Sequence, residues 1–378
     1  GLTEKGDIYS ESLAAVHAGI TSTFDMPNVD PNTTTIELLE KRNKLGAEKS
    51  WTNYSYYFGA TENNLEEIIK LNPKETCGLK VFMGTSTGTL LVEDDFALEQ
   101  IFEHCPVTIV THCEDNETIK INSDKINSEN KELDASFHPI IRNDTCCYKS
   151  SSKVIELAKK YSSDLHVLHL TTEKEIELFE NIDLQNKKIT CEVCVHHLWF
   201  DDTDYAKLGN LIVCNPAIKK ESDKNALRKA LKDGYIDYVA TDHAPHSLED
   251  KKLPYGNAPA GIPLIEHSFH MMIELYKQGF YSLNEVVSYM SHKVADRFCI
   301  KDRGYVREGY KADLMIFDLD KKTLVENKTE KTKCGWTPFH GQTFNSSVLG
   351  TIVNGKLIVT NGSLVADFSS AEKIYFDR

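Results

Sequence analysis

The sequence lacks the segments that mark membrane and secreted proteins. No run approaches the roughly 18 consecutive apolar residues of a membrane-spanning helix, and no basic start leads into an apolar signal core. A disulfide framework is not indicated either, because the 10 cysteines are irregularly spaced over 378 residues. Cysteines used in this way are typical of reduced thiols. We therefore expect a cytoplasmic protein that does not contact a membrane.

Positive charge is scarce as well. Lys and Arg number 43 against 57 Asp and Glu, which gives a net charge of −14 spread along the chain. Nucleic-acid binding requires a basic patch, so we expect no nucleic-acid partner. Glycine-rich phosphate loops, internal repeats and low-complexity tracts do not stand out. A small anionic substrate stays open, because it needs only a few locally placed donors.

What the sequence contains is an ordinary globular composition, with 40% hydrophobic and 26% charged residues. Short β-branched runs alternate with amphipathic ones. The candidate strands are Gly19–Asp25, Ser55–Phe58, Gly78–Met83, Val107–Thr111, Leu165–Leu170, Ile189–Val195 and Tyr238–Thr241. The candidate helices are Thr34–Glu48, Leu65–Leu71, Lys153–Tyr161, Glu173–Asn181 and Ser222–Lys232, the last with Ser222 as its N-cap. This alternation predicts βαβ units and a parallel sheet.

The seven candidate strands are one fewer than the eight of a closed (β/α)8 barrel. We predict a TIM-type α/β barrel over residues 1–300 that contains strands two to eight. After a further helix at Leu283–Phe298 the pattern changes, since Ala312–Asp318 and Thr351–Val359 read as antiparallel strands. The second of these turns at Asn354-Gly355, a pair typical of hairpins. We therefore predict a small β-sandwich module, of which residues 301–378 form the C-terminal part.

Polar side chains stand at the ends of four candidate strands. They are Lys80, His112, His169 and Asp242. Active sites of (β/α)8 barrels lie at these C-terminal strand ends. A lone histidine there is more often a buried residue with a hydrogen-bond partner, and a lone buried lysine is usually half of an ion pair. Four such residues at four strand ends instead favour a site for zinc or a similar divalent ion.

Successive side chains of a strand point to opposite faces, so sequence position indicates which neighbours face the same side as these residues. Asp242 shares its face with the small residues Ala240 and Ala244, which leave room for an ion. His169 shares a face with Val167, whereas His166 points the other way and reads as structural. The cysteines are a weak alternative: Cys191-x-x-Cys194 has zinc-like spacing, but on a strand the two thiols face opposite sides and no second such pair exists. We read most cysteines as small packing residues.

Several motifs together carry a family resemblance. They are Asp25-Met26-Pro27-Asn28-Val29-Asp30-Pro31, Gly78-Leu79-Lys80-Val81-Phe82-Met83, His112-Cys113-Glu114-Asp115, His166-Val167-Leu168-His169, the stretch Thr190–Leu198, Asn215-Pro216-Ala217-Ile218-Lys219, Ala240-Thr241-Asp242-His243-Ala244-Pro245-His246 and the stretch Gly335–Gly341. The chain resembles, along its whole length, the dihydroorotase branch of the metal-dependent cyclic amidohydrolases. It departs from the family pattern at Val195, where proline is usual, and at Lys219, where arginine is usual.

The resemblance implies a two-zinc site bridged by a carboxylated Lys80. A lysine ammonium cannot bind a metal, but a carbamate on that nitrogen is an anion that bridges two ions. In the family pattern one ion takes the bridge, His112 and His169, and the other takes the bridge, Asp242 and two histidines of the first strand. Asp242 then moves the proton from the attacking water to the leaving nitrogen. An unmodified Lys80 paired with Glu114 or Asp242 remains the alternative.

Substrate residues are implied by the same resemblance. Asn28, Asn215 and His246 match positions that hold the carboxylate and ring amide, and the backbone at Ala260-Gly261 matches a loop that contacts the ring. Asn28 has an alternative role in turn chemistry after Met26-Pro27. Glu192 and His196 share a face of their predicted strand, which indicates groups that support the metal ligands or an auxiliary metal. Ordinary hydrogen bonding inside the barrel is the alternative for both.

The family's first strand carries an H-x-H pair and then an arginine, and Gly1-Leu2-Thr3 resembles the residues immediately after that arginine. No two histidines of this sequence are two residues apart, and His17 is no substitute. We expect a fragment of an active enzyme whose first strand lies outside the sequence, with a degenerate protein as the alternative. As written, the chain should lack full activity and leave two sheet edges unpaired.

The resemblance predicts a zinc-dependent dihydroorotase that interconverts dihydroorotate and N-carbamoyl-aspartate in pyrimidine biosynthesis, acting as a homo-oligomer. Allantoinase and hydantoinase are the enzymatic alternatives, because they share the metal-binding strands. A catalytically inactive dihydroorotase-like subunit, which supports a partner enzyme through oligomeric contacts, is the alternative of another class.

Overall fold

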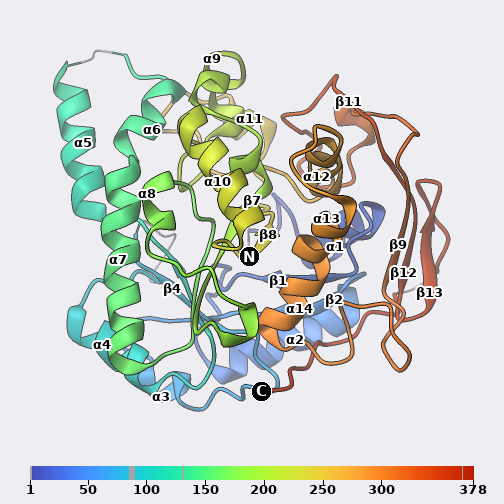
Figure 1. Ribbon diagram of the computed structural model, residues 1–378, viewed down its shortest axis with the longest axis horizontal. Coiled ribbons are helices and arrows are strands. Elements are labelled where there is room, and N and C mark those ends of the chain that lie inside the picture. The colour runs from blue at the N-terminus through green and yellow to red at the C-terminus, as the bar shows by residue number, and fades with distance from the viewer. Residues whose placement is uncertain (1, 85–89, 130–131, 368) are drawn as a thin grey trace.

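The computed structural model describes residues 2–84, 90–129, 132–367 and 369–378 (Figure 1). Parallel strands surrounded by helices form its main body. These strands are β1 (Ser22–Asp25), β2 (Asn53–Tyr56), β3 (Phe58–Gly59), β4 (Leu79–Phe82), β5 (Ile109–His112), β6 (Leu165–Val167), β7 (Ile189–Cys194) and β8 (Tyr238–Ala240). β1 pairs with β2, and β3 to β8 pair in chain order, all in parallel. The predicted parallel α/β barrel architecture is confirmed.

The second barrel strand is split where the sequence predicts a single strand at Ser55–Phe58. Its first part, β2, pairs with β1, and its second part, β3, pairs with β4. Tyr57 marks the change of partner: its backbone N–H donates to Asp25 O at 3.0 Å, while the next residue, Phe58, donates to Gly78 O at 3.1 Å. The strand therefore connects β1 to the six-stranded sheet, and seven successive barrel strands result.

Within the described residues, β1 pairs only with β2 and β8 only with β7. The two unpaired sheet edges expected from the sequence are therefore present. Aromatic side chains fill the barrel interior near them. The Phe298 ring lies 5.2 Å from that of Phe24 in β1 and 6.2 Å from that of Tyr238 in β8, measured between centroids. Phe298 thus contacts both edge strands from within one hydrophobic cluster.

The helices surround this sheet, with α4, α5 and α7 together on the left of Figure 1. They are α1 (Ile8–His17), α2 (Ile36–Lys49), α3 (Leu65–Ile68), α4 (Asp95–His104), α5 (Asn116–Glu129), α6 (His138–Ile141), α7 (Asp144–Tyr161), α8 (Glu173–Ile176), α9 (Tyr205–Leu208), α10 (Glu221–Asp233), α11 (Leu248–Lys251), α12 (Ser268–Lys277), α13 (Leu283–Val287) and α14 (Lys293–Phe298). The described part of the chain contains no helix that is long and apolar enough to cross a membrane.

Some helix boundaries differ from those predicted, for local reasons. α7 begins at Asp144, well before the predicted Lys153, because the Asn143 side chain caps it by accepting from Cys146 N at 3.1 Å. The predicted cap at Ser222 is wrong: the N-cap of α10 is Lys220, and Ser222 lies inside the helix. The single helix predicted at Leu283–Phe298 is interrupted by a π-helical turn at Ser288–His292, which separates α13 from α14. α8 is shorter than predicted and ends at Ile176.

A separate antiparallel sheet stands on the right of Figure 1. Its strands are ordered β14 (Ser363–Leu364), β13 (Lys356–Thr360), β12 (Ser347–Val353) and β9 (Leu314–Asp318), while β10 (Thr323–Leu324) and β11 (Thr343–Phe344) pair with each other. The predicted turn between β12 and β13 is confirmed, since Asn354 and Gly355 have φ of 49° and 81°. The sheet packs on α1, and the Thr351 hydroxyl donates to Val16 O at 2.6 Å.

The chain returns from this sheet to the barrel at its end. Ile374 N donates to Tyr54 O at 2.9 Å, and Phe376 N donates to Lys74 O at 3.0 Å. The Arg378 guanidinium donates to Cys77 O at 3.0 Å and to Phe298 O at 3.1 Å. Residues 373–378 therefore lie against the barrel, on the side opposite the C-terminal ends of the strands.

Candidate active site

Lys80 lies inside β4, which pairs with β3 on one side and β5 on the other. Its residue exposure is 3%, and its Nζ lies 4.5 Å from the centroid of the Phe82 ring. Burial lowers the pKa of Lys80 to about 8, against the opposing effect of the Asp242 carboxylate. A buried amine of this kind loses its proton more readily than an exposed lysine, and the uncharged amine is the form that reacts with carbon dioxide.

Two imidazoles meet next to this lysine. His112 is the last residue of β5, and His169 lies just beyond β6 with a positive φ of 41°. His112 Nδ1 and His169 Nε2 are 3.1 Å apart. Burial lowers the pKa of both side chains. Both rings are therefore neutral near pH 7, which is the form of histidine that binds metals.

Asp242 lies just beyond β8 with a positive φ of 45°. Part of the residue is open to solvent, yet removal of its carboxylate from bulk water raises the pKa of Asp242 to about 6, with Lys80 acting in the opposite direction. The lysine in turn lowers the pKa of His169. Lys80 thus interacts electrostatically with both His169 and Asp242, and His169 is in direct contact with His112.

A buried ion pair lies behind His112. His112 Nε2 lies 3.0 Å from Glu114 Oε2, and Arg142 forms a salt bridge with the same carboxylate oxygen. Burial acts to raise the pKa of Glu114, but Arg142 and His112 outweigh it and lower the pKa to about 2. Sequence reasoning considered Glu114 only as a partner of Lys80 and did not single out Arg142. Since Arg142 belongs to none of the quoted motifs, only the fold reveals it.

Glu192 of β7 joins the site from the interior of the barrel. Its Oε2 lies 3.2 Å from His166 Nε2, and the Tyr238 hydroxyl lies 2.7 Å from the same nitrogen. Glu192 also contributes to the raised pKa of Asp242. His166, fully buried and bonded to Thr190 Oγ1 at 2.8 Å, has the packing contacts expected of a structural residue.

His196 does not lie on the strand where the sequence placed it. β7 ends at Cys194, and His196 and His197 occupy a 3-10 turn (Val195–Leu198), so Glu192 and His196 do not share a strand face as the sequence suggested. Burial alone lowers the pKa of His196 to about 3, with no contribution from Lys80 or Asp242. Neither ring nitrogen of His196 has a hydrogen-bond partner among the described residues.

The described part of the chain contains two clusters of side chains that could bind a metal. Within each cluster the potential ligand atoms lie within 4.8 Å of one another. The clusters are Cys194, His196 and His197, and Glu114, Cys146 and Cys147. In the second cluster Glu114 is already held by Arg142. All 10 cysteines are free, as expected for packing residues. By contrast, Lys80, His112, His169 and Asp242 combine neutral imidazoles, a carboxylate and a reactive amine, and this donor set fits a divalent metal centre.

Asn215 is held by residues that sequence reasoning missed. The Nε2 of His138 lies 3.1 Å from Asn215 Oδ1 and 2.9 Å from Cys214 O, while its Nδ1 lies 2.9 Å from the Tyr255 hydroxyl. Burial lowers the pKa of His138 to about 4, so the ring is neutral. With Nε2 as the donor, the contact fixes the side-chain oxygen of Asn215 and leaves its amide group available.

His246 and the loop at Ala260-Gly261 meet directly. His246 Nε2 donates to Ala260 O at 3.0 Å, and burial lowers the pKa of this histidine to about 4. Gly261 has a φ of 143°, and a Cβ at this position would lie 2.4 Å from Ala244 O. Only glycine therefore permits this approach of the two loops. The sequence placed both segments at the site, and the structure brings them together.

Asn28 comes after the buried Pro27 in a tight turn. The carbonyl of Pro27 accepts from Val29 N at 2.9 Å and Thr33 N at 3.0 Å, and Arg42 donates to Met26 O at 2.7 Å. Among the described residues the Asn28 side chain has no hydrogen-bond partner. These contacts fit turn chemistry for the backbone and leave the amide side chain available to a ligand.

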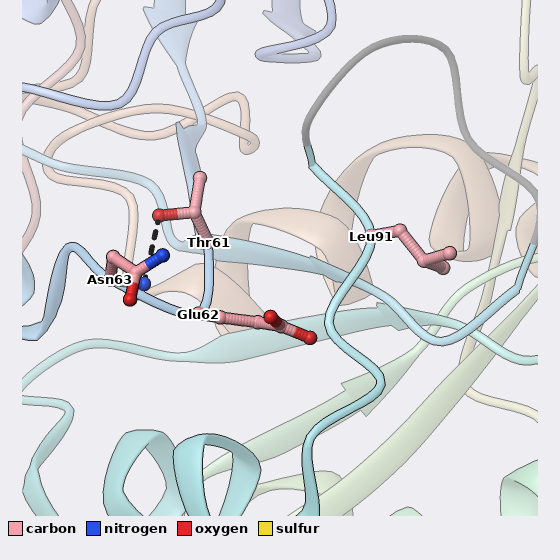
Figure 2. A pocket seen from close by; sticks show the side chains of 4 residues that line it. All are labelled: Thr61, Glu62, Asn63 and Leu91. Atoms are coloured by element: carbon pink, nitrogen blue, oxygen red, sulfur yellow. Dashed lines mark hydrogen bonds between the residues drawn. The ribbon is translucent and has the colours of Figure 1, made fainter.

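A cavity of about 390 Å³ opens beyond the second barrel strand, lined by Thr61, Glu62, Asn63 and Leu91 (Figure 2). Asn63 N donates to Thr61 Oγ1 at 3.3 Å. The Glu62 side chain points into the space between the segment 61–63 and the segment that carries Leu91 (Figure 2). None of the predicted site residues lines this cavity. A second cavity of about 560 Å³, which includes Arg297 and Arg378, lies at the opposite end of the barrel.

The chain is similar to known proteins in both sequence and fold. The sequence profile of the amidohydrolase family matches residues 4–358. A dihydroorotase of Lactobacillus acidophilus is 30% identical over 366 residues, which cover 96% of this chain and 85% of the relative. A dihydroorotase of Methanothermobacter thermautotrophicus is 27% identical over 367 residues, covering 97% and 82%. Among solved structures, the L-hydantoinase (dihydropyrimidinase) from Arthrobacter aurescens matches with a TM-score of 0.92 at 24% identity, covering 99% of this chain and 85% of that one.

Proposed function

The chain belongs to the amidohydrolase family and is a cyclic amide hydrolase, and within that family we propose that it is a zinc-dependent dihydroorotase. The reaction is the reversible hydrolysis of dihydroorotate to N-carbamoyl-aspartate in pyrimidine biosynthesis, carried out by a cytoplasmic homo-oligomer. The observation that carries the proposal is the contact of His112 with His169, together with the electrostatic interaction of the buried Lys80 with both His169 and Asp242. The dihydroorotase relatives, which align over almost the whole chain, support this choice of substrate.

Lys80, His112, His169 and Asp242 would hold the metal, with Lys80 as a carbamate. When bound, divalent zinc would acidify a water molecule and polarise the amide carbonyl. The Glu114 carboxylate fixes the ring of His112 by accepting from Nε2, and Arg142 keeps that carboxylate charged. A histidine held in this way presents its other nitrogen in a defined direction.

Asp242 is the residue that we assign to proton transfer. Hydrolysis forms a C–O bond from water to the ring carbonyl carbon and breaks the ring C–N bond, so one proton must leave the water and one must reach the departing nitrogen. Asp242 accepts the first and delivers it to the second. In ring closure the same carboxylate takes the proton from the attacking nitrogen and returns it to the departing oxygen.

The substrate would lie against Asn28, Asn215, His246 and the backbone of Ala260-Gly261. The pKa of His246, lowered to about 4, keeps the ring neutral, so it recognises the substrate by hydrogen bonding and not by charge. Its Nε2 is engaged with Ala260 O, while Nδ1 is buried without a partner among the described residues. Nδ1 is therefore the atom left for the substrate.

Turnover of dihydroorotate by the protein as its gene encodes it tests the proposal, with hydantoin and allantoin as competing substrates and zinc counted per subunit. Turnover confined to dihydroorotate with about two zinc ions would support it. Turnover of hydantoin or allantoin instead would favour the alternative amidohydrolases. A folded protein inactive on all three would favour the non-catalytic subunit.

Asp242→Asn should abolish turnover of dihydroorotate and leave the fold intact. A matched control is Asp233→Asn at the end of α10, where the carboxylate forms an ion pair with the exposed Lys229. That control should keep the activity of the unmodified protein. Substantial activity in Asp242→Asn would remove this residue from the mechanism.

A further inference from the structure

Lys251, at the end of α11, is a buried cation bonded only to backbone carbonyls among the described residues. Its exposure is 2%, and its Nζ donates to Val213 O at 3.2 Å, Pro259 O at 2.9 Å and Gly261 O at 3.0 Å. Three acceptors use all three protons of the ammonium group. None of the ion pairs in the described part of the chain includes this lysine. Burial lowers its pKa to about 8, which reflects the cost of this placement.

These three carbonyls belong to two different loops of the candidate site. Val213 precedes Asn215 by two residues, while Pro259 and Gly261 flank Ala260. Lys251 itself is joined to His246 by the short segment that begins α11, where Ser247 caps the helix by accepting from Asp250 N at 3.0 Å. One side chain thus connects all three segments that carry Asn215, His246 and Ala260-Gly261.

Direct hydrogen bonds between described residues also join these loops, including one from Ala244 N to Ile262 O at 3.1 Å. Gly261 N donates to Val213 O at 2.9 Å, and His246 Nε2 donates to Ala260 O at 3.0 Å. Without the ammonium group, Pro259 O and Gly261 O would lose a buried partner. An unpaired buried carbonyl costs about 1–3 kcal/mol, and the cheapest relief is for the loop at 259–261 to move towards water.

We propose that Lys251 is a positioning residue that sets how tightly the site binds its substrate, by holding the Asn215 and Ala260-Gly261 loops against His246. It does not contact the four strand-end residues assigned to metal binding. Its loss should therefore weaken substrate binding much more than the chemical step. This inference rests on the proposed function, because it assumes that these loops bind the ring substrate.

Lys251→Met keeps the length of the side chain and removes every donor, whereas Lys251→Gln keeps two donors on a shorter chain. We expect Lys251→Met to raise KM for dihydroorotate about tenfold or more, with kcat changed less than about threefold. Lys251→Gln should fall between it and the unmodified protein. Lys252→Met, at the exposed neighbouring position, is the matched control and should change neither constant.

Hydrogen exchange gives a second measurement that does not depend on activity. In Lys251→Met, the amides of residues 260–262 and 213–215 should exchange faster, while those of β4 to β6 stay unchanged. An unchanged KM with unchanged exchange would overturn the inference. Faster exchange throughout the barrel in both Lys251→Met and Lys251→Gln would also overturn it, because Lys251 would then stabilise the whole fold and not the loops in particular. If the unmodified protein turns over none of the cyclic amides, the proposed function fails, whereas the exchange experiment still decides whether Lys251 holds the loops.

Discussion

Replacing Arg142 by methionine should destabilise the protein through a carboxylate that the substitution does not touch. Glu114 is completely buried, and its charge is balanced by Arg142 and by a hydrogen bond with His112. The fall in its pKa from 4.5 to about 2 corresponds to about 3 kcal/mol of stabilisation at pH 7. Breaking a buried ion pair by removing one partner typically costs about 3–5 kcal/mol. We expect a loss within this range.

Urea unfolding of metal-free protein measures this loss as a change of midpoint at constant slope. Because the folded-state pKa of Glu114 lies below the ordinary value, its contribution is fully present above about pH 4.5 and disappears as the pH falls through about 2. The difference between Arg142→Met and the unmodified protein should therefore shrink over that interval. Zinc affinity should also fall by about 10- to 100-fold, since His112 loses its orientation.

Lys153→Met provides the matched control. It removes an exposed ion pair with Asp95, in which the side chains are 45% and 82% exposed, and should cost no more than about 0.5 kcal/mol. Equal losses in the two variants, or a loss in Arg142→Met that stays constant down to pH 2, would refute the argument that Arg142 compensates the Glu114 charge.

Three further predictions concern other parts of the molecule. Burial and Glu330 raise the pKa of Glu266 to about 8. Between about pH 4.5 and 8 the carboxyl group therefore ionises more readily in the unfolded chain, which destabilises the folded protein. The melting temperature of Glu266→Gln should equal that of the unmodified protein at pH 4.5 and exceed it by a growing margin up to pH 8. Gly261→Ala should lower stability by more than about 1 kcal/mol in urea unfolding and raise KM, because its Cβ would lie 2.4 Å from Ala244 O; unchanged values would contradict the tight approach. Asn143→Ala should cost about 1 kcal/mol in urea unfolding through loss of the α7 cap, and an unchanged midpoint would contradict that role.

The sequence predicted the parallel barrel and the positions of the strand-end residues because both depend on local patterns. A β-branched run that ends in one polar residue marks the C-terminal end of a strand, wherever the helices fall. His112, His169 and Asp242 could therefore be placed at strand ends in advance, whereas Lys80 lies inside β4 and not at its end. The hairpin at Asn354-Gly355 is local for the same reason, since both residues readily adopt positive φ.

Residues that act through tertiary contacts could not be found in this way. Arg142 lies 28 residues from its partner Glu114, and Lys251 contacts carbonyls that carry no sequence signal of their own. His138 reaches Asn215 across 77 residues. Each is a polar side chain whose burial depends on the packing of several loops, so its role is invisible until those loops are placed.

Helix ends failed where tertiary contacts override the local preference for a capping residue. Ser222 has the right chemistry for an N-cap, but α10 begins at Glu221, just after Lys219. The buried Lys219 ammonium donates to Thr171 Oγ1 and Ala217 O, each at 3.1 Å. These contacts fix the chain immediately before the helix, and the helix begins earlier than the serine would have placed it.

Because residues 373–378 return to the barrel, residues 301–372 are connected to the barrel at both of their ends. The module leaves the barrel at Ile300, and Ile300 forms a β-bridge with Phe376 on the way back. Entry and exit points are therefore side by side, as they are in a domain inserted into a host. Such a module is anchored at both ends and cannot swing on a single linker. Between these two points the module also packs into the main core of the barrel, through Phe339 and Phe344. Cutting the chain after residue 371 would remove the second anchor and uncover the aromatic cluster around Phe298, to which Phe376 belongs.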